Sequence, residues 1–150
     1  MTELKIEINA SAELIAVADE LRQKVFIDEQ GVPDDEIFDG QNARAIHLVA
    51  FEGTHAVATA RIVQEGTNWR IGLVAVDRLM RGKHLGEKIM AAAIEHVKAI
   101  DEASEIVLTA QRPVQAFYEK LGFKQSGEAR IFDSGFALVS MKYQPNMSQF

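Results

Sequence analysis

Six residues at a predicted junction between a strand and a helix constrain the fold of this chain most strongly. The sequence RGKHLG at positions 81–86 follows an apolar run at 71–76 and precedes a segment with helical apolar spacing that extends to position 100. The junction has two glycines and two cations, whereas a simple turn needs one glycine at most. A helix N-terminus presents unpaired backbone N–H groups and the positive end of the helix dipole, which favour anions. The junction therefore predicts either an ordinary turn or a cradle for a phosphate group.

Known phosphate-binding motifs narrow this choice. The lysine followed by serine or threonine of the Walker loop is missing, and so is the three-glycine pattern of dinucleotide-binding domains. The segment 81–86 is thus a different kind of phosphate cradle or an ordinary strand-to-helix turn.

The N-terminal third of the chain predicts a strand, a helix and an acidic loop. Apolar residues alternate at positions 4, 6 and 8, as in a half-buried strand. Ser11 is placed to cap a helix whose apolar face continues to Val25. The acidic segment 28–44 is broken by Gly31 and Pro33, so we expect a loop with at most a short helical turn.

The remaining elements complete a mixed α+β pattern. We expect strands at 46–51, 56–63, 69–76, 106–109, from 123 onward and at 137–143, helices at 87–100 and 114–121, a turn at 133–135, and a frayed tail at 144–150. A meander of strands followed by alternating helices and strands predicts a mixed sheet with helices on both faces. The same order excludes a doubly wound Rossmann domain.

Composition limits the chemistry. A chain of 150 residues is expected to form a single domain over residues 1–150. Cysteine is absent, which excludes disulfides and cysteine nucleophiles, and no metal-ligand spacing occurs, so we expect no metal. A net charge of −6 disfavours nucleic acid and favours a cationic, amine-bearing partner. No membrane-length apolar run or signal-peptide pattern is present, so we expect a cytoplasmic protein without a membrane partner.

A second motif lies about 30 residues after the glycine-rich junction. The sequence AFYEKLGF at 116–123 predicts an amphipathic helix that stops at Gly122 and turns directly into a strand. Phe117, Leu121 and Phe123 have the spacing of core residues, so packing alone would also explain this motif.

Together the two motifs resemble the GNAT family of acyl-CoA-dependent N-acetyltransferases. RGKHLG matches the family pattern Arg/Gln-x-x-Gly-x-Gly/Ala, FYEKLGF is similar to the family's downstream helix, and the order of elements agrees over nearly the whole chain. The sequences LRQKVF at 21–26 and EQGVP at 29–33, with His47 and AQ at 110–111, look like one uncharacterised bacterial branch of the family.

The resemblance implies both a fold and a reaction. The fold would be a GNAT fold, with a mixed, mostly antiparallel sheet of six to seven strands and helices on both faces. The reaction would be direct transfer of an acetyl group from acetyl-CoA (coenzyme A) to a small-molecule or peptide amine, without an acyl-enzyme. Dimers are common in the family, so the resemblance leaves a homodimer open.

The resemblance also implies roles for individual residues on the donor side. Tyr118 matches the usual general acid that gives a proton to the CoA sulfur, although a packed tyrosine is the alternative. The backbones of Val74 and Val76 would pair with the pantetheine arm. The pyrophosphate would be bound by Arg81, Gly82, Lys83, His84, Leu85 and Gly86.

Two departures from the family pattern stand out. His84 occupies the position of the usual middle glycine, so its Cβ must tolerate the local backbone conformation or shift the loop. Leu73 and the segment 135–137 stand where the branch commonly has an arginine and a histidine. Both changes remove polar groups from the acceptor side.

The acceptor side has candidates rather than a motif. Glu29 lies in the loop expected to wall the acceptor pocket and would be the general base, with a solvated acidic surface as the alternative. By their place in the branch pattern, the substrate-binding candidates are Arg22, Gln30, His47, Arg61 and Gln111. Each can equally be a structural partner, and His47 in particular can be a hydrogen-bonded core histidine.

Two other functions remain open from sequence. A GNAT-fold module that binds acyl-CoA without turnover would be consistent with His84 in the loop and with the lack of an obvious base. An interaction protein using the acidic segment 34–39 as its contact surface is the third possibility.

Overall fold

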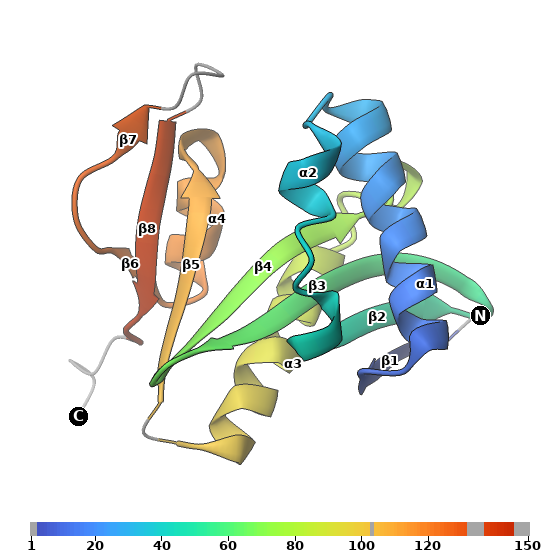
Figure 1. Ribbon diagram of the computed structural model, residues 1–150, viewed down its shortest axis with the longest axis horizontal. Helices are drawn as coiled ribbons and strands as arrows, with labels where there is room; N and C mark the ends of the chain where they lie inside the picture. Colours follow the sequence, from blue (N-terminus) through green and yellow to red (C-terminus); the bar gives the residue numbers. More distant parts are fainter. Residues whose placement is uncertain (1–2, 103, 132–136, 146–150) are drawn as a thin grey trace.

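A mixed β-sheet organises the chain (Figure 1), and the computed structural model describes residues 3–102, 104–131 and 137–145. Seven strands follow one hydrogen-bonded path in the order β1-β2-β3-β4-β5-β8-β6, and a two-residue β7 pairs with β8. The β4–β5 pair is parallel and the other pairs are antiparallel. The strand bounds are β1 Leu4–Asn9, β2 Ile46–Glu52, β3 His55–Glu65, β4 Asn68–Val76, β5 Glu105–Gln111, β6 Phe123–Gln125, β7 Arg130–Ile131 and β8 Ala137–Tyr143.

Helices cover both faces of this sheet, as predicted. The α-helices are α1 Ala12–Arg22, α2 Asp34–Ile37, α3 Leu85–Ile100 and α4 Gln115–Lys120. A π-helical segment, Gln23–Glu29, continues α1, and short 3-10 turns occupy Asn42–Arg44, Arg78–Met80 and Arg112–Val114. Figure 1 shows α1 and α2 in front of the sheet and α3 behind it. The α+β class and the mostly antiparallel sheet expected from sequence are therefore confirmed.

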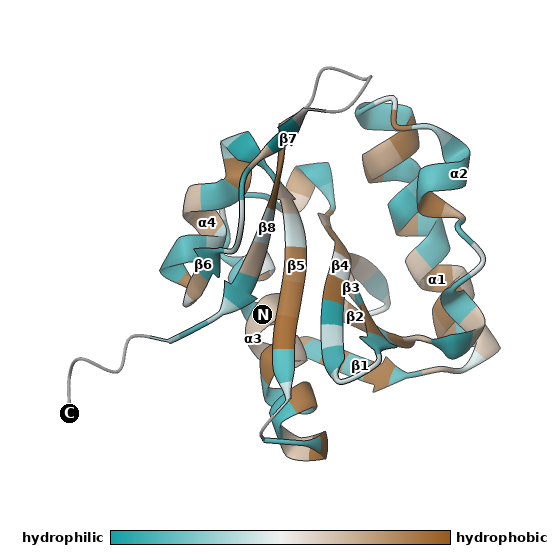
Figure 2. Cartoon of the chain, turned by 60° about the vertical axis from the view of Figure 1, so that its left-hand side comes forward, coloured by the Kyte–Doolittle hydropathy of each residue, from teal (hydrophilic) through white to brown (hydrophobic). Residues whose placement is uncertain are grey.

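Two sets of apolar contacts fix the helices to the sheet. On one face, α3 inserts Ile89, Ala93 and Val97, each 0% exposed, among buried strand residues such as Leu48 and Ile71. On the other face, α1 packs through Leu14 and Ala18 on Val49. Figure 2 shows strand β5 as largely hydrophobic and α2 as largely hydrophilic. The core therefore lies on both sides of the sheet, which explains why the middle strands are apolar on both faces.

The pairing of β4 and β5 is confined to one end. Three register pairs join them, from Asn68↔Glu105 to Arg70↔Val107, and the strands then diverge (Figure 1). Past this point, Leu73 and Val74 lie opposite the single residue Ala60 of β3, which defines a β-bulge. Leu73 has φ +48°, a left-handed conformation that costs a non-glycine residue about 1–2 kcal/mol. The divergence opens a space in the middle of the sheet.

The structure differs from the sequence-based expectation at residues 23–29. The first α-helix was expected to continue to Val25, but α1 ends at Arg22 and passes into the π-helix Gln23–Glu29. The expected loop at 28–44 contains the short helical turn that the sequence allowed, the four-residue α2 directly after Pro33, and in addition the 3-10 turn Asn42–Arg44. Ser11 caps α1 as predicted, because its Oγ accepts a hydrogen bond from the N–H of Leu14 at 3.1 Å.

Some expectations fall on residues outside the described ones. The turn at 133–135 lies there, as do positions 146–150 of the expected frayed tail. None of the helices in the described part of the chain combines the length and apolar character needed to cross a membrane.

Candidate functional site

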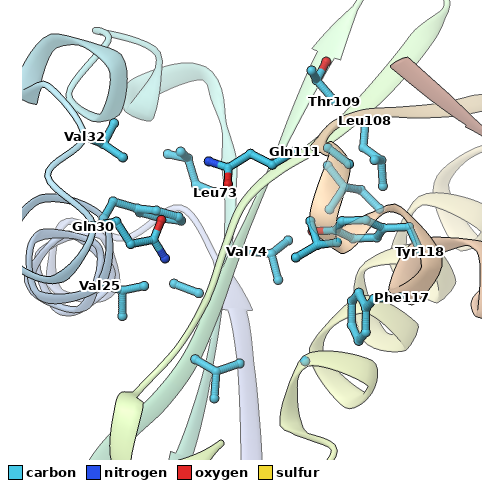
Figure 3. A pocket seen from close by; sticks show the side chains of 18 of the residues that line it. Val25, Gln30, Val32, Leu73, Val74, Leu108, Thr109, Gln111, Phe117 and Tyr118 are labelled. Atoms are coloured by element: carbon cyan, nitrogen blue, oxygen red, sulfur yellow. The ribbon is translucent and has the colours of Figure 1, made fainter. Parts of the chain in front are cut away.

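The space between β4 and β5 is a cavity of about 1200 Å³. Segments from both faces of the sheet line it: the π-helix and α2 on one side, and residues 81–87 with α4 on the other. Figure 3 shows Val25, Gln30 and Val32 on one side of β4, and Phe117 and Tyr118 on the opposite side. The cavity therefore passes through the sheet and has two chemically distinct ends.

The loop 81–86 forms one end of the cavity with its backbone. Gly82 has φ +84°, and a Cβ placed on it would meet no atom within 4 Å, so the glycine faces open space. His84 is the N-cap residue of α3 in a left-handed conformation, φ +62°. Its side chain does not cap the helix and instead pairs with Glu87, with Nδ1 3.0 Å from Oε1. The first turn of α3 thus points toward the cavity without a side-chain cap, which suits an anion.

Gly86 has a packing role that joins the two sequence motifs. A Cβ on Gly86 would lie 3.2 Å from Cζ of Phe117 and 3.8 Å from Cγ2 of Val76. The missing side chain therefore lets the start of α3 pack closely against α4 and the end of β4. The backbone of Gly86 lines the cavity, while Lys83 does not, its Nζ lying 3.9 Å from Sδ of Met80.

Arg81 and Glu29, predicted to have separate roles, are partners. The Nη2 group of Arg81 donates to Oε1 of Glu29 at 2.8 Å, and Nη1 donates to the other carboxylate oxygen. The same guanidinium donates to the backbone oxygen of Val76 through Nε at 3.2 Å and Nη2 at 3.1 Å. The hydrogen bonds from Arg81 hold the pKa of Glu29 below its ordinary value, and Glu29 in turn raises the pKa of Arg81.

This pairing changes what Glu29 can do chemically. Glu29 is not among the residues that line the main cavity, and a carboxylate with a lowered pKa is a weaker base. Glu29 ends the π-helix, so its bonds to Arg81 fasten that segment to the end of β4. The geometry supports a positioning role for Glu29 better than the predicted role of general base.

Tyr118 projects from α4 into the cavity (Figure 3). Its ring packs edge-to-face on Phe117, with centroids 5.0 Å apart, and on Phe123 at 6.2 Å. Burial raises the pKa of Tyr118 to about 12. The phenol is therefore protonated at neutral pH and can donate a proton to a group in the cavity.

The five predicted acceptor residues separate into two groups. Gln30 and Gln111 line the cavity (Figure 3). Arg22, His47 and Arg61 do not, and all three are buried, with exposures of 0%, 0% and 6%.

A buried polar network accounts for Arg22 and His47. Nη2 of Arg22 lies 3.1 Å from Nδ1 of His47, and Nε2 of His47 lies 3.1 Å from the backbone oxygen of Asn42. Because a carbonyl oxygen can only accept, Nε2 carries the proton and Nδ1 accepts from Arg22. Burial lowers the pKa of His47, the hydrogen bond to the Asn42 carbonyl partly opposes this effect, and the cations of Arg22 and Arg61 lower the pKa further, so this histidine is neutral at neutral pH.

Arg61 extends this network to the acidic segment. Its Nη2 and Nη1 donate to the two carboxylate oxygens of Asp39 at 2.7 and 2.9 Å, and Nη1 also donates to Oδ1 of Asn42. The Asn42 amide donates in turn to Asp19, which accepts from Arg22 at 3.2 Å. Asp39 is therefore a structural partner rather than part of a free acidic contact surface.

Several cavity residues were not selected from the sequence. They include Glu36 on α2, the apolar side chains of Phe26, Ile37 and Leu138, and Thr109 on β5. Phe26 belongs to the segment 21–26 quoted for the family resemblance, and the others belong to no motif. The three-residue spacing of His84 and Glu87 is a local signal for the contact between these two residues. Within the described ranges, no three carboxylate or histidine side chains are arranged to hold a metal ion.

Solved structures identify the class of protein that has this fold. The crystal structure of Escherichia coli ElaA matches with a TM-score of 0.84 and 25% identity, covering 96% of this chain and all of that chain. A Bacillus subtilis acetyltransferase solved in complex with CoA matches with a TM-score of 0.72 at 19% identity, covering 96% of this chain and 100% of that one, and therefore shares the fold. The sheet, its central split and the flanking helices thus form an acetyltransferase-type fold.

Sequence comparison then establishes the family. The family model described as an acetyltransferase (GNAT) domain matches residues 7–145, so the chain belongs to the GNAT acetyltransferase family. The uncharacterized N-acetyltransferase YjcF of Bacillus subtilis is 28% identical over 138 residues, which cover 92% of this chain and 98% of YjcF. ElaA of Escherichia coli is 30% identical over 109 residues, covering 69% of this chain and 71% of ElaA. The resemblance inferred from the two motifs is confirmed.

Proposed function

We propose that the protein transfers an acetyl group from acetyl-CoA to an amine by direct attack. The observation that carries the proposal is a single cavity that contains both the uncapped start of α3 and the hydroxyl-bearing side chain of Tyr118. A CoA thioester needs this end of the site to bind the anionic pyrophosphate and to donate a proton to the departing thiolate. A small-molecule or peptide acceptor and a cytoplasmic location are part of the proposal, and a homodimer remains open.

The donor would be held by the loop 81–86 and the free edge of β4. Gly82 leaves open space for a pyrophosphate beside the backbone, and Arg81, although paired with Glu29, holds its guanidinium at the start of this loop. Val74 lies in the bulge, past the last pairing with β5, so this stretch of strand edge can bond to an extended pantetheine arm. The carbonyl of Val76 already accepts from Arg81, which reduces its capacity for a further bond.

The proposed chemistry needs no covalent enzyme intermediate. In the reaction the amine nitrogen bonds to the acetyl carbon, the C–S bond breaks, one proton leaves the nitrogen and one reaches the sulfur. Tyr118 donates the proton to sulfur, because its raised pKa keeps the hydroxyl protonated up to strongly alkaline pH. Gln30 and Gln111 offer amide groups that can orient the acceptor.

One observation favours a second function, an acyl-CoA-binding module without turnover. The carboxylate predicted as base is bound to Arg81 and lies outside the cavity lining. Release of free CoA in the presence of an amine separates the two functions, whereas binding of CoA is common to both.

Two glycine variants test the donor site. Gly82→Glu places a carboxylate in the open space beside the loop, and Gly66→Glu is its matched control, because Gly66 also has positive φ, +62°, with no atom near its missing Cβ. Acetyl-CoA at 100 times its Kd should stabilise the parent and the Gly66 variant by about 2.7 kcal/mol, seen as a rise in Tm. The Gly82 variant should lose this rise. Two results would contradict the proposed donor site: an equal rise in Tm for the two variants, or no rise in Tm for either variant or for the parent.

A further inference from the structure

The end of the cavity opposite the glycine loop is predominantly apolar. The π-helix contributes Phe26, the segment before α2 contributes Val32, and α2 contributes Ile37. The bulge of β4 contributes Leu73, the 3-10 turn Arg112–Val114 contributes Val114, and β8 contributes Leu138. The polar side chains on this wall are few, chiefly the uncharged amides of Gln30 and Gln111 and the carboxylate of Glu36. Such a wall gains most from an apolar ligand, since burying apolar surface is favourable and burying an unpaired polar group is not.

Charge is distributed unevenly along the cavity. Among the described residues that line it, the arginine and histidine side chains are Arg81 and His84, both in the loop at the donor end, where Arg81 pairs with Glu29 and His84 pairs with Glu87, which also lines the cavity. Arg70 donates to Thr109 at the rim, but its guanidinium is neutralised by Glu65 at 3.0 Å. The charged group on the apolar wall is the carboxylate of Glu36. This wall therefore attracts an ammonium group and offers no cation to a carboxylate.

Resting on the proposed acetyl transfer, we propose that the acceptor is a primary amine attached to an apolar body that carries no carboxylate, such as an arylalkylamine. The body packs on the wall that includes Phe26, Ile37 and Leu73, and the ammonium enters past Glu36. An amino acid would place its carboxylate against apolar side chains or against Glu36, where it loses hydration without gaining a partner. A polyamine would meet Glu36 but leave the wall uncovered.

An acceptor panel tests this substrate class. Phenethylamine and phenylalanine differ only by a carboxylate, and spermidine is cationic but lacks an apolar body. With acetyl-CoA, and following the free thiol of CoA, kcat/KM for phenethylamine should exceed that for each of the other two at least tenfold. Equal or better use of phenylalanine or spermidine would overturn the proposal.

Two variants connect the preference to the wall. Leu73→Arg introduces a cation into the bulge, and it should move the ratio of kcat/KM for phenethylamine to that for phenylalanine at least tenfold toward the amino acid. Glu36→Gln should raise KM for phenethylamine several-fold with little change in kcat. Asp35→Asn, the adjacent α2 carboxylate outside the cavity lining, is the control and should leave KM unchanged. A rise in Tm with CoA shows that each variant is folded, and an unchanged ratio in folded Leu73→Arg would count against the proposal.

If free CoA appears with none of the acceptors, the proposed acetyltransferase function is itself overturned, and the acceptor site is then tested by binding. Calorimetric titration of CoA-saturated protein then measures the amines directly: at least tenfold tighter binding of phenethylamine than phenylalanine supports the apolar amine site, and equal or weaker binding overturns it. A longer acyl chain is the rival occupant of the wall. If octanoyl-CoA is used more than tenfold better than acetyl-CoA and the preference among amines disappears, the wall binds the acyl chain and the proposal fails.

Discussion

The guanidinium of Arg81 donates two hydrogen bonds to the carboxylate of Glu29, which lies 52 positions earlier in the chain, and Nη2 is 2.8 Å from Oε1. Arg81 also donates to the carbonyl of Val76, so one side chain connects the π-helix, the end of β4 and the loop before α3. A residue expected to bind the donor and a residue expected to activate the acceptor are thus a single structural unit.

Glu29→Gln separates a positioning role from a catalytic one. Glutamine keeps an oxygen that can accept from Arg81, so we expect kcat to change less than about threefold, whereas loss of a general base typically costs about 10²- to 10⁴-fold. The KM for acetyl-CoA should fall, because the cation of Arg81 is no longer neutralised. Steady-state kinetics with a saturating amine measures both constants, and a hundredfold loss of kcat would restore Glu29 as the base.

Tyr118→Phe tests proton donation without disturbing packing. The ring should still pack on Phe117 and Phe123, so the rise in Tm with CoA should be retained. Loss of the hydroxyl should lower kcat roughly ten- to a few hundred-fold, because solvent can partly replace the acid for a thiolate leaving group. Unchanged turnover would make Tyr118 a packing residue.

The pH profile of the parent enzyme follows from the pKa of the same tyrosine. Activity should rise between pH 6 and 9 as the acceptor ammonium loses its proton. Because burial raises the pKa of Tyr118 to about 12, the acid remains protonated and no alkaline decline should appear below about pH 10. Measurement of kcat/KM across this range checks the prediction, and a descending limb near pH 9 would contradict it.

The backbone at position 84 predicts an unusual order of stability for two variants. His84 is left-handed, φ +62°, where glycine is favoured over alanine by about 1 kcal/mol. His84→Gly should therefore melt about 3 °C above His84→Ala, opposite to their order within a helix. Both variants lose the contact with Glu87, so their comparison isolates the backbone effect. A more stable alanine variant would show that the loop is not left-handed in solution.

His47 should make stability depend on pH. Burial and the cations of Arg22 and Arg61 lower its pKa in the folded state, against the partial opposition of the hydrogen bond to the Asn42 carbonyl and of Asp19. The unfolded chain then binds more protons below about pH 6.5, so stability is present above that pH and is lost as the pH falls. The Tm should drop from pH 7 to pH 5 more steeply in the parent than in His47→Gln. The KM for the amine should be unaffected in this variant, since His47 lies outside the cavity lining.

Much of the fold could be predicted because its signals are local. Ser11 lies directly before a helical pattern, and alternating or continuous apolar runs mark the strands of the meander. The π-helix after Arg22 could not be predicted, because its apolar spacing over one or two turns is indistinguishable from that of an α-helix.

The candidate site was predicted only where it depends on a contiguous motif. The loop 81–86 and Tyr118 were selected because each lies in a contiguous motif, RGKHLG and AFYEKLGF. Partner choice was not predictable: Arg22 and His47 are 25 positions apart, Arg61 and Asp39 are 22 apart, and no local pattern pairs them. The place of Arg22 and Arg61 in the family-branch pattern suggested that they line a pocket, whereas folding buries both in a polar network outside the cavity lining.

The bonds of Glu29 and Asp39 have a consequence for how this protein can diverge. Glu29 is hydrogen-bonded to Arg81 and Asp39 to Arg61. The segment 30–38 is therefore held at both ends, by the loop before α3 and by β3. Six residues of this segment line the cavity, and neither Glu29 nor Asp39 is among the residues that line it. For the proposed acetyl transfer, substitutions within these nine residues are therefore the changes expected to alter acceptor specificity while the donor loop keeps its sequence.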